Sequence, residues 1–189
     1  MCGAWQNNRA ARGMPEGPAT VQVMAPCDEC GYDDETAGRA EILGVIPGLA
    51  AEHSGLLRSV PAERLRAHTR PGSWSPLEYG CHVRDLLAVQ RGRVQLAQAG
   101  HTPRFASMRR DERAVEEAYN EQDPFAVADE ITAAAGAFTR ALAALDDAGW
   151  ARTGVYPWPE PQVRTVEWIG RRTVHELAHH LFDNRRLLC

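Results

Sequence analysis

The sequence predicts an all-α protein built as a four-helix bundle, and three observations point to this fold class. Four long segments carry apolar residues at intervals of three or four, the period of an amphipathic helix. Two of these segments begin with strong helix-start signals. No segment shows the strict apolar–polar alternation of a half-buried strand. Four long helices with medium loops bury their apolar faces best as a bundle.

The first helix is expected over residues 35–57. It follows an irregular leader, residues 1–34, which is rich in Gly, Pro, Asn and Asp and has no apolar period. The apolar stripe of the helix is Ile42, Ile46, Leu49, His53 and Leu56. Pro47 should kink the helix or start it afresh, because proline lacks an N–H and clashes with the preceding turn. The bundle domain is therefore expected over residues 35–189.

The second helix is expected over residues 75–99 and has the clearest start signal in the chain. Ser75, Pro76 and Glu78 fit a capping box with proline in the first helical turn. In such a box the Ser75 hydroxyl accepts from the Glu78 amide, and the Glu78 carboxylate accepts from the Ser75 amide. Gly100 is suited to end the helix.

The third helix is expected over residues 123–149, with Asp123 as its cap and a proline directly after it. Residues 101–122 before it are polar and should form a loop with a short helix. Residues 151–164 contain three prolines and are expected to form a loop. The fourth helix should begin near Thr165 and continue to the end of the sequence.

The composition is that of a soluble globular protein and gives no case for nucleic acid or membrane binding. The net charge is −4 and the pI is about 6.0, which does not favour anionic partners. No apolar run approaches the roughly 18 residues of a membrane span. The first residues do not form a signal peptide, so a cytoplasmic location is expected. All 21 basic residues are Arg, which is typical of a GC-rich genome such as that of an actinobacterium.

The five cysteines argue against a disulfide framework, because their number is odd. Cys27 and Cys30 form a lone C-x-x-C without a second cysteine pair of similar spacing. We expect them to lie in the leader, outside the bundle. Cys81 should point away from its neighbour His82 and pack in the core, since adjacent helical residues are rotated by about 100°.

The most informative segment is in the fourth helix, where His175 and His179 lie four residues apart. This spacing puts two imidazoles on one helix face, with Cβ atoms about 6 Å apart, so they can share a metal ion. The letters also match the metalloprotease pattern H-E-x-x-H, in which Glu176 would be the general base. The third histidine of that pattern is missing, because Arg185 stands at its position.

A third ligand must therefore come from another helix, and the apolar stripes offer either His82 or His53. Asp183 and Glu78 are expected to orient ligand imidazoles by hydrogen bonds rather than to bind the ion. The remaining histidines, His68, His101 and His180, are expected at the surface.

The segment Trp74–Asp85, followed about 90 residues later by the pair His175 and His179, resembles the DinB superfamily. More narrowly it is similar to the DinB-like, mycothiol-dependent maleylpyruvate isomerase group, over about residues 35–188. The resemblance implies an up-down-down-up four-helix bundle. It also implies one His ligand from the second helix and an H-x-x-x-H pair, or in some members E-x-x-x-H, from the fourth. By this match the ligands are His82, His175 and His179, and Glu176 is incidental.

The resemblance implies a metal-dependent thiol transferase or isomerase that uses mycothiol as co-substrate and acts on a small electrophile. A divalent metal favours the thiolate, which is the nucleophilic form of a thiol. Zinc is the expected ion, with nickel and iron as alternatives. Arg172 and Arg104 are candidates to hold a carboxylate of the thiol or substrate. A hydrolase that uses metal-bound water and a non-catalytic, metal-binding stress-response bundle remain alternatives, and a homodimer is an open option.

Overall fold

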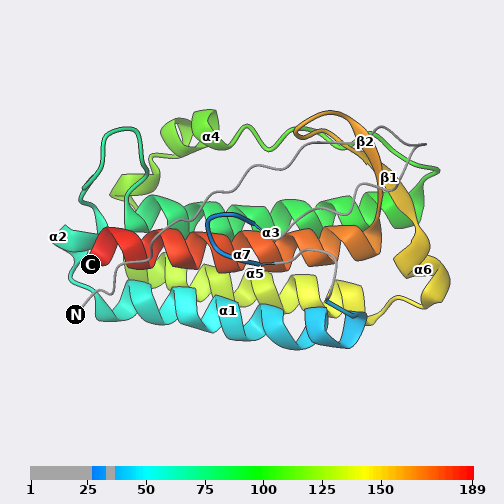
Figure 1. Cartoon of the computed structure of the whole chain (residues 1–189), viewed down its shortest axis with the longest axis horizontal. Coiled ribbons are helices and arrows are strands. Elements are labelled where there is room, and N and C mark those ends of the chain that lie inside the picture. Colours follow the sequence, from blue (N-terminus) through cyan, green and yellow to red (C-terminus); the bar gives the residue numbers. More distant parts are fainter. Residues whose placement is uncertain (1–26, 33–36) are drawn as a thin grey trace, which may run out of the picture.

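The computed structural model describes residues 27–32 and 37–189, and four long helices form its bundle (Figure 1). These helices are α1 (Arg39–Ser59), α3 (Pro76–Ala99), α5 (Pro124–Ala143) and α7 (Val166–Leu188). α1 and α7 run in one direction, and α3 and α5 run in the other. α5 and α7 each pack against both α1 and α3. The expected all-α fold with up-down-down-up order is therefore confirmed. Most of the leader lies outside the described residues.

Local capping explains where α3 and α5 begin. The Ser75 hydroxyl accepts from the Glu78 amide at 3.2 Å, and the Glu78 carboxylate accepts from the Ser75 amide at 2.6 Å. The Asp123 carboxylate accepts from the Phe125 amide at 3.1 Å. Both predicted caps are confirmed, and each satisfies backbone N–H groups that have no partner within the helix.

Helix α1 continues through Pro47 without an interruption, which corrects the expectation of a restart there. Pro47 is exposed, so the carbonyl that loses its helical N–H partner can be hydrated. The opposite face packs into the core through Ile42 and Ile46, both fully buried. A short helix, α2 (Ala62–Leu65), follows before α3.

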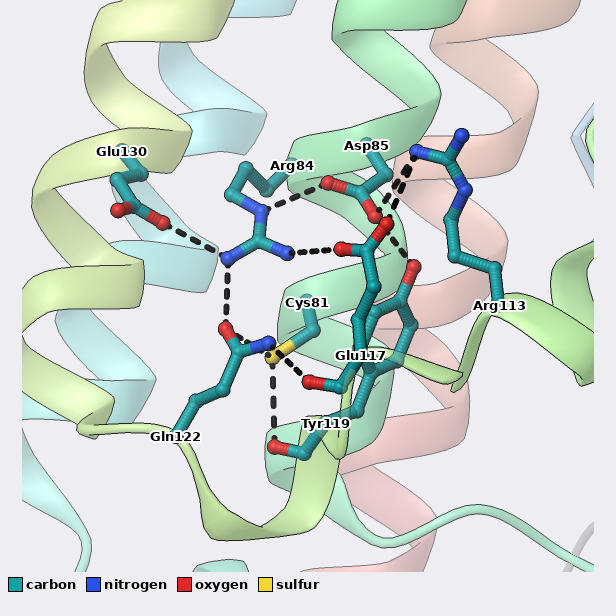
Figure 2. Close-up of polar contacts among 8 residues, drawn as sticks. All are labelled: Cys81, Arg84, Asp85, Arg113, Glu117, Tyr119, Gln122 and Glu130. Carbon is teal, nitrogen blue, oxygen red and sulfur yellow. Dashed lines mark hydrogen bonds and ion pairs between the residues drawn. The ribbon is translucent and has the colours of Figure 1, made fainter. Parts of the chain in front are cut away.

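The connection from α3 to α5 is long because the two helices run in the same direction and must begin at the same end of the bundle. It contains α4 (Arg110–Glu116) and the 3₁₀ turn η1 (Tyr119–Glu121). Figure 2 shows how a network of polar contacts among eight residues, some buried and some exposed, fixes this connection to α3.

At the centre of that network the Asp85 carboxylate accepts from the Tyr119 hydroxyl and, at 2.8 Å, from Arg84 Nε. Arg84 Nη1 also donates to Gln122 at 2.7 Å and to Glu130 of α5 at 2.8 Å. The Cys81 thiol contacts the Tyr119 carbonyl at 3.6 Å, and the side chain is fully buried. Core packing of Cys81 is thus confirmed.

The segment expected as a proline-rich loop forms a β-hairpin instead. Strand β1 (Thr153–Tyr156) pairs antiparallel with β2 (Gln162–Thr165), and the prolines occupy the turn between them. Gly154 permits this arrangement, because a Cβ there would lie 2.1 Å from the Phe105 ring. The expected third helix is also shorter than predicted: it ends at Ala143, and α6 (Asp147–Ala151) follows as a separate turn.

Large apolar side chains from all four long helices fill the space between them. They include Ile42, Ile46, Leu87, Ile131, Phe138 and Leu177, each less than 2% exposed. Among the described residues, no helix combines the length and the apolar character that a membrane crossing requires.

Candidate metal centres

Helix α7 carries two pairs of metal-ligating side chains, and the pairs interleave along the helix. His175 and His179 are four residues apart, and so are Glu176 and His180. Each pair therefore shares one face. Successive helical residues are rotated by about 100°, so the two pairs point in different directions. The structure gives each pair its own partners.

The first set joins His82 of α3 to Glu176 and His180 of α7; we call it the triad. One donor atom from each residue lies within 4.8 Å of the other two. His82 and His180 are only 3% and 6% exposed. Among the described residues, His82 Nδ1 and His180 Nε2 are buried without a hydrogen-bond partner. Glu176 Oε2 lies 3.3 Å from His180 Nε2, outside hydrogen-bond geometry.

Two further α7 side chains contact the triad. Asp183 Oδ2 lies 3.1 Å from Nδ1 of His180, and this hydrogen bond leaves Nε2 on the triad side. Arg172 forms an ion pair with the Glu176 carboxylate. Both contacts restrict the directions in which the triad donors can point.

Burial and charge together set the protonation of the triad. Burial, followed by the charge of His180, lowers the pKa of His82 to about 3. Burial alone would raise the pKa of Glu176, but the adjacent His180 and the charge of Arg172 hold it well below the usual range. Burial opposes the charged form of His180, yet Asp183 and Glu176 raise its pKa above the ordinary value. The triad therefore favours positive charge at its centre, which a proton or a divalent cation can supply.

Aromatic rings enclose the triad on the α3 side. The Trp74 ring lies 5.0 Å from that of His82, and the Tyr79 ring lies 5.2 Å from that of His180. Trp74 directly precedes the capping box of α3, so the same local structure that starts the helix also positions this ring. These rings limit access of water to the imidazoles from that side.

The second set consists of Cys27, Cys30, His175 and His179; we call it the Cys2His2 cluster. Their donor atoms all lie within 4.8 Å of one another. Cys27 Sγ is 3.6 Å from His179 Nδ1. The two cysteines belong to the short segment 27–32, which crosses α7 in Figure 1. The expectation that they lie apart from the bundle, without partner ligands, is thus corrected.

A tight turn presents the two thiols. The Gly31 amide donates to the Cys27 carbonyl at 2.8 Å, and Gly31 takes a φ of 72°, which glycine adopts without strain. Burial opposes ionisation of Cys27, but amide hydrogen bonds and the His175 side chain lower its pKa to about 6. Burial and the neighbouring Cys27 raise the pKa of Cys30 to about 11.

A cavity of about 630 Å³ extends over both sets. Triad and cluster residues line one part of it, and Trp158 of the hairpin turn lines another. Its basic lining residues are Arg93, Arg109, Arg110 and Arg172. Three carboxylates, of Asp111, Glu112 and Glu176, line it as well. A cavity of this size suits a small molecule, and its guanidinium groups can hold a carboxylate.

The structure divides the predicted ligand set. His82 lies in the triad, while His175 and His179 lie in the Cys2His2 cluster, so the described residues do not bring these three into one donor group. His180, expected at the surface, is buried, and Glu176, expected to be incidental, belongs to the triad. The sequence signal for this set is the E-x-x-x-H spacing of Glu176 and His180, which begins one residue after the His175 and His179 pair.

Other candidate residues also differ in their placement. Glu78 caps α3 and contacts His68 at 2.7 Å rather than a triad imidazole. Arg172 lines the cavity, but Arg104 is exposed and is not among the residues that line it. Arg104 instead belongs to a backbone bridge with Val155 of β1.

The fold and the triad together define a class of protein: a helical bundle with histidine and carboxylate ligands gathered between two of its helices. The chain belongs to the DinB superfamily, whose family model matches residues 50–182. A search of curated proteins finds no match. Among solved structures, the chain is similar to YfiT from Bacillus subtilis, described as a probable metal-dependent hydrolase with an unusual four-helix bundle topology. The TM-score is 0.71 at 18% identity, over 82% of this chain and 91% of YfiT.

Proposed function

We propose that this protein is a metal-dependent enzyme whose centre is the triad of His82, Glu176 and His180. We further propose that it activates a low-molecular-weight thiol of the mycothiol class for attack on a small electrophile. The observation that carries the proposal is the buried, convergent donor set at the wall of a cavity that four Arg side chains also line. Mycothiol-class thiols are intracellular, so this function would place the protein in the cytoplasm.

The triad residues fit a divalent metal ion by their chemistry. His82 Nδ1 and His180 Nε2 are buried nitrogens that no described group satisfies by a hydrogen bond, and leaving such atoms unpaired is costly. Two imidazoles and one carboxylate form a frequent ligand set of catalytic zinc, which leaves a coordination position open. This set also fits the E-x-x-x-H form that the family resemblance allows on the fourth helix.

When bound, a divalent ion at the triad would supply Lewis acidity and favour the deprotonated form of a coordinating thiol or water. The protein's own residues would orient the ligands, exclude water and bind the substrates. Asp183 holds His180 in one orientation, and Trp74 and Tyr79 keep bulk water from one side. Arg109 and Arg110 lie at the cavity wall, where they can hold an anionic group of thiol or substrate.

Hydrolysis is the second candidate, and two observations favour it. The similar structure YfiT is described as a probable metal-dependent hydrolase, and a ligand set of two His and one Glu also occurs in zinc peptidases. On this hypothesis water replaces the thiol as nucleophile. Glu176 is then a ligand rather than the general base, and Asp111 and Glu112 are the other carboxylates that line the cavity.

The test is a pair of parallel activity assays on the zinc-loaded protein. The first supplies mycothiol, bacillithiol, glutathione or cysteine together with a halide-bearing fluorogenic electrophile. The second supplies activated esters and amides without a thiol. Turnover that requires one thiol and is lost in His82→Ala and Glu176→Gln supports thiol transfer. Thiol-independent hydrolysis lost in the same variants overturns it in favour of the hydrolase. Activity unchanged in both variants would exclude the triad as the centre.

A further inference from the structure

The Cys2His2 cluster lies outside the triad, and neither the fold nor the proposed reaction accounts for it. We propose that Cys27, Cys30, His175 and His179 form a second, structural zinc site that clamps segment 27–32 onto α7. This proposal stands independently of the proposed function.

The residue types and their spacing match those of structural zinc sites. Such sites take four Cys or His ligands in tetrahedral arrangement, commonly as C-x₂₋₄-C with H-x₃₋₅-H. Here the cysteines stand at positions 27 and 30 and the histidines at 175 and 179. The second half of the pattern is a histidine pair on a distant helix rather than a second cysteine pair. A closed set of four protein ligands is typical of a structural rather than a catalytic site.

The distances agree with tetrahedral coordination. With Zn–S of about 2.3 Å and Zn–N of about 2.05 Å at a tetrahedral angle, sulfur and nitrogen should lie about 3.6 Å apart. The structure places Cys27 Sγ and His179 Nδ1 3.6 Å apart. The donor atoms of all four residues lie within 4.8 Å of one another, so the four side chains converge on one small volume.

The outer nitrogen of His179 has the partners that a zinc-bound imidazole usually has. While Nδ1 faces Cys27, Nε2 lies 3.3 Å from the Glu29 carboxylate and 3.6 Å from that of Asp183. Carboxylates in this place fix the ring and raise its basicity as a ligand. On the other histidine, the Tyr32 ring stacks against His175 with centroids 5.6 Å apart, which holds that imidazole at the cluster.

Charge balance explains how this site can lie so close to the triad. The ring centroids of His179 and His180 are 5.6 Å apart, so the two sets are neighbours, and two uncompensated divalent ions in them would repel each other. Two thiolates cancel the charge of a zinc ion at the cluster, so it adds no net charge beside the triad. A neutral site is also compatible with Arg172, whose Nη1 lies 3.3 Å from His175 Nδ1.

The consequence of the clamp is structural. Cys27 lines the cavity, so a zinc ion at the cluster would fix one part of the cavity wall. The segment 27–32 is short and has few apolar side chains, so hydrophobic burial alone contributes little to its attachment.

The experiment counts zinc in the purified full-length protein by mass spectrometry and records the absorption spectrum of the cobalt-substituted protein. The variants are Cys27→Ser with Cys30→Ser for the cluster and His82→Ala for the triad, with Cys189→Ser, an exposed cysteine, as matched control. We expect two zinc ions per chain in the wild type and the control, and one in each of the other variants. Thiolate-to-cobalt charge-transfer bands should persist in His82→Ala and vanish in the cysteine variant.

Three results would overturn the proposal. Equal zinc content in the wild type and the cysteine variant would exclude the cysteines as ligands. A cobalt spectrum without thiolate bands in His82→Ala would exclude a sulfur-ligated site in a folded protein. A Cys27–Cys30 disulfide found by mass spectrometry in metal-depleted protein, with no zinc uptake after reduction, would make the pair a redox couple. Because each variant removes one site, failure of the cluster leaves the triad and its function testable.

Discussion

Asp183 offers a sharp test of how the triad is oriented, because it contacts a triad imidazole without being one of the three donors. Its carboxylate lies 3.1 Å from His180 Nδ1 in hydrogen-bond geometry. This contact fixes the tautomer in which Nε2 is free to bind an ion. The substitution Asp183→Ala removes the acceptor and its charge, whereas Asp183→Asn keeps an acceptor oxygen and removes only the charge.

Loss of such an outer hydrogen bond typically weakens metal affinity about 10- to 100-fold, which corresponds to about 1.4–2.7 kcal/mol. Because the His180 ring is almost fully buried, water cannot easily replace the carboxylate. We therefore expect Asp183→Ala near the upper end of this range and Asp183→Asn near the lower end.

The assay is zinc competition against a chromophoric chelator in a Cys27→Ser, Cys30→Ser background, so that the signal reports the triad. Asp111→Asn is the control, because Asp111 lines the same cavity but pairs with Arg110 rather than with a triad residue. Its affinity should equal that of the background protein. If Asp183→Ala also binds zinc as tightly as the background protein, the orienting role is wrong and His180 is not held through Nδ1.

Two further predictions concern stability. Tyr119→Phe removes a buried hydroxyl that donates to the Asp85 carboxylate. Urea unfolding should therefore show a free energy of unfolding about 2 kcal/mol lower, with an unchanged m-value. A free energy of unfolding unchanged within error would show that Arg84 and Arg113 alone satisfy Asp85. Burial lowers the pKa of His53 to about 4 in the folded state. As the pH drops, the unfolded chain therefore binds a proton at His53 before the folded chain does, so stability should fall from about pH 6.5 towards pH 4. The expected loss in the free energy of unfolding is about 2 kcal/mol between about pH 7 and pH 5. His53→Gln should remove that part of the pH dependence, and an unchanged pH profile would contradict the assignment.

The helices could be predicted because their signals are local. The Ser75–Glu78 capping box and the Asp123 cap involve residues within one helical turn, so sequence alone specifies them. The hairpin could not be predicted in the same way. Its strands have four residues each, too few for a clear alternation, and β1 gains backbone bonds from Pro103 and Phe105, about 50 positions earlier. Pairing at that distance leaves no local pattern.

The ligand-bearing helices of the candidate site could be predicted from the sequence, but the grouping of their ligands could not. Helical periodicity identifies α7 as a ligand-bearing helix, and His82 lies on a neighbouring helix in a recognisable segment. Periodicity cannot decide whether His82 faces the pair at 175 and 179 or the pair at 176 and 180, because both have the same spacing and differ by a rotation of about 100°. The Cys2His2 cluster is harder still, since 152 positions separate Cys27 from His179.

The interleaving on α7 has a consequence for any experiment on this helix. His179 and His180 are adjacent in sequence but belong to different donor sets, and Asp183 contacts both rings, at 3.6 Å and 3.1 Å. A substitution of His179 therefore tests the cluster, and one of His180 tests the triad, although both would reduce the total metal content. Loss of zinc in a His179 variant alone thus fits both one ion ligated by His82, His175 and His179 and two ions in separate sites. The thiolate-to-cobalt charge-transfer bands separate these two arrangements. His82 and the cysteines bind the same ion in neither of them, and only the arrangement with two sites places a thiolate on a metal ion.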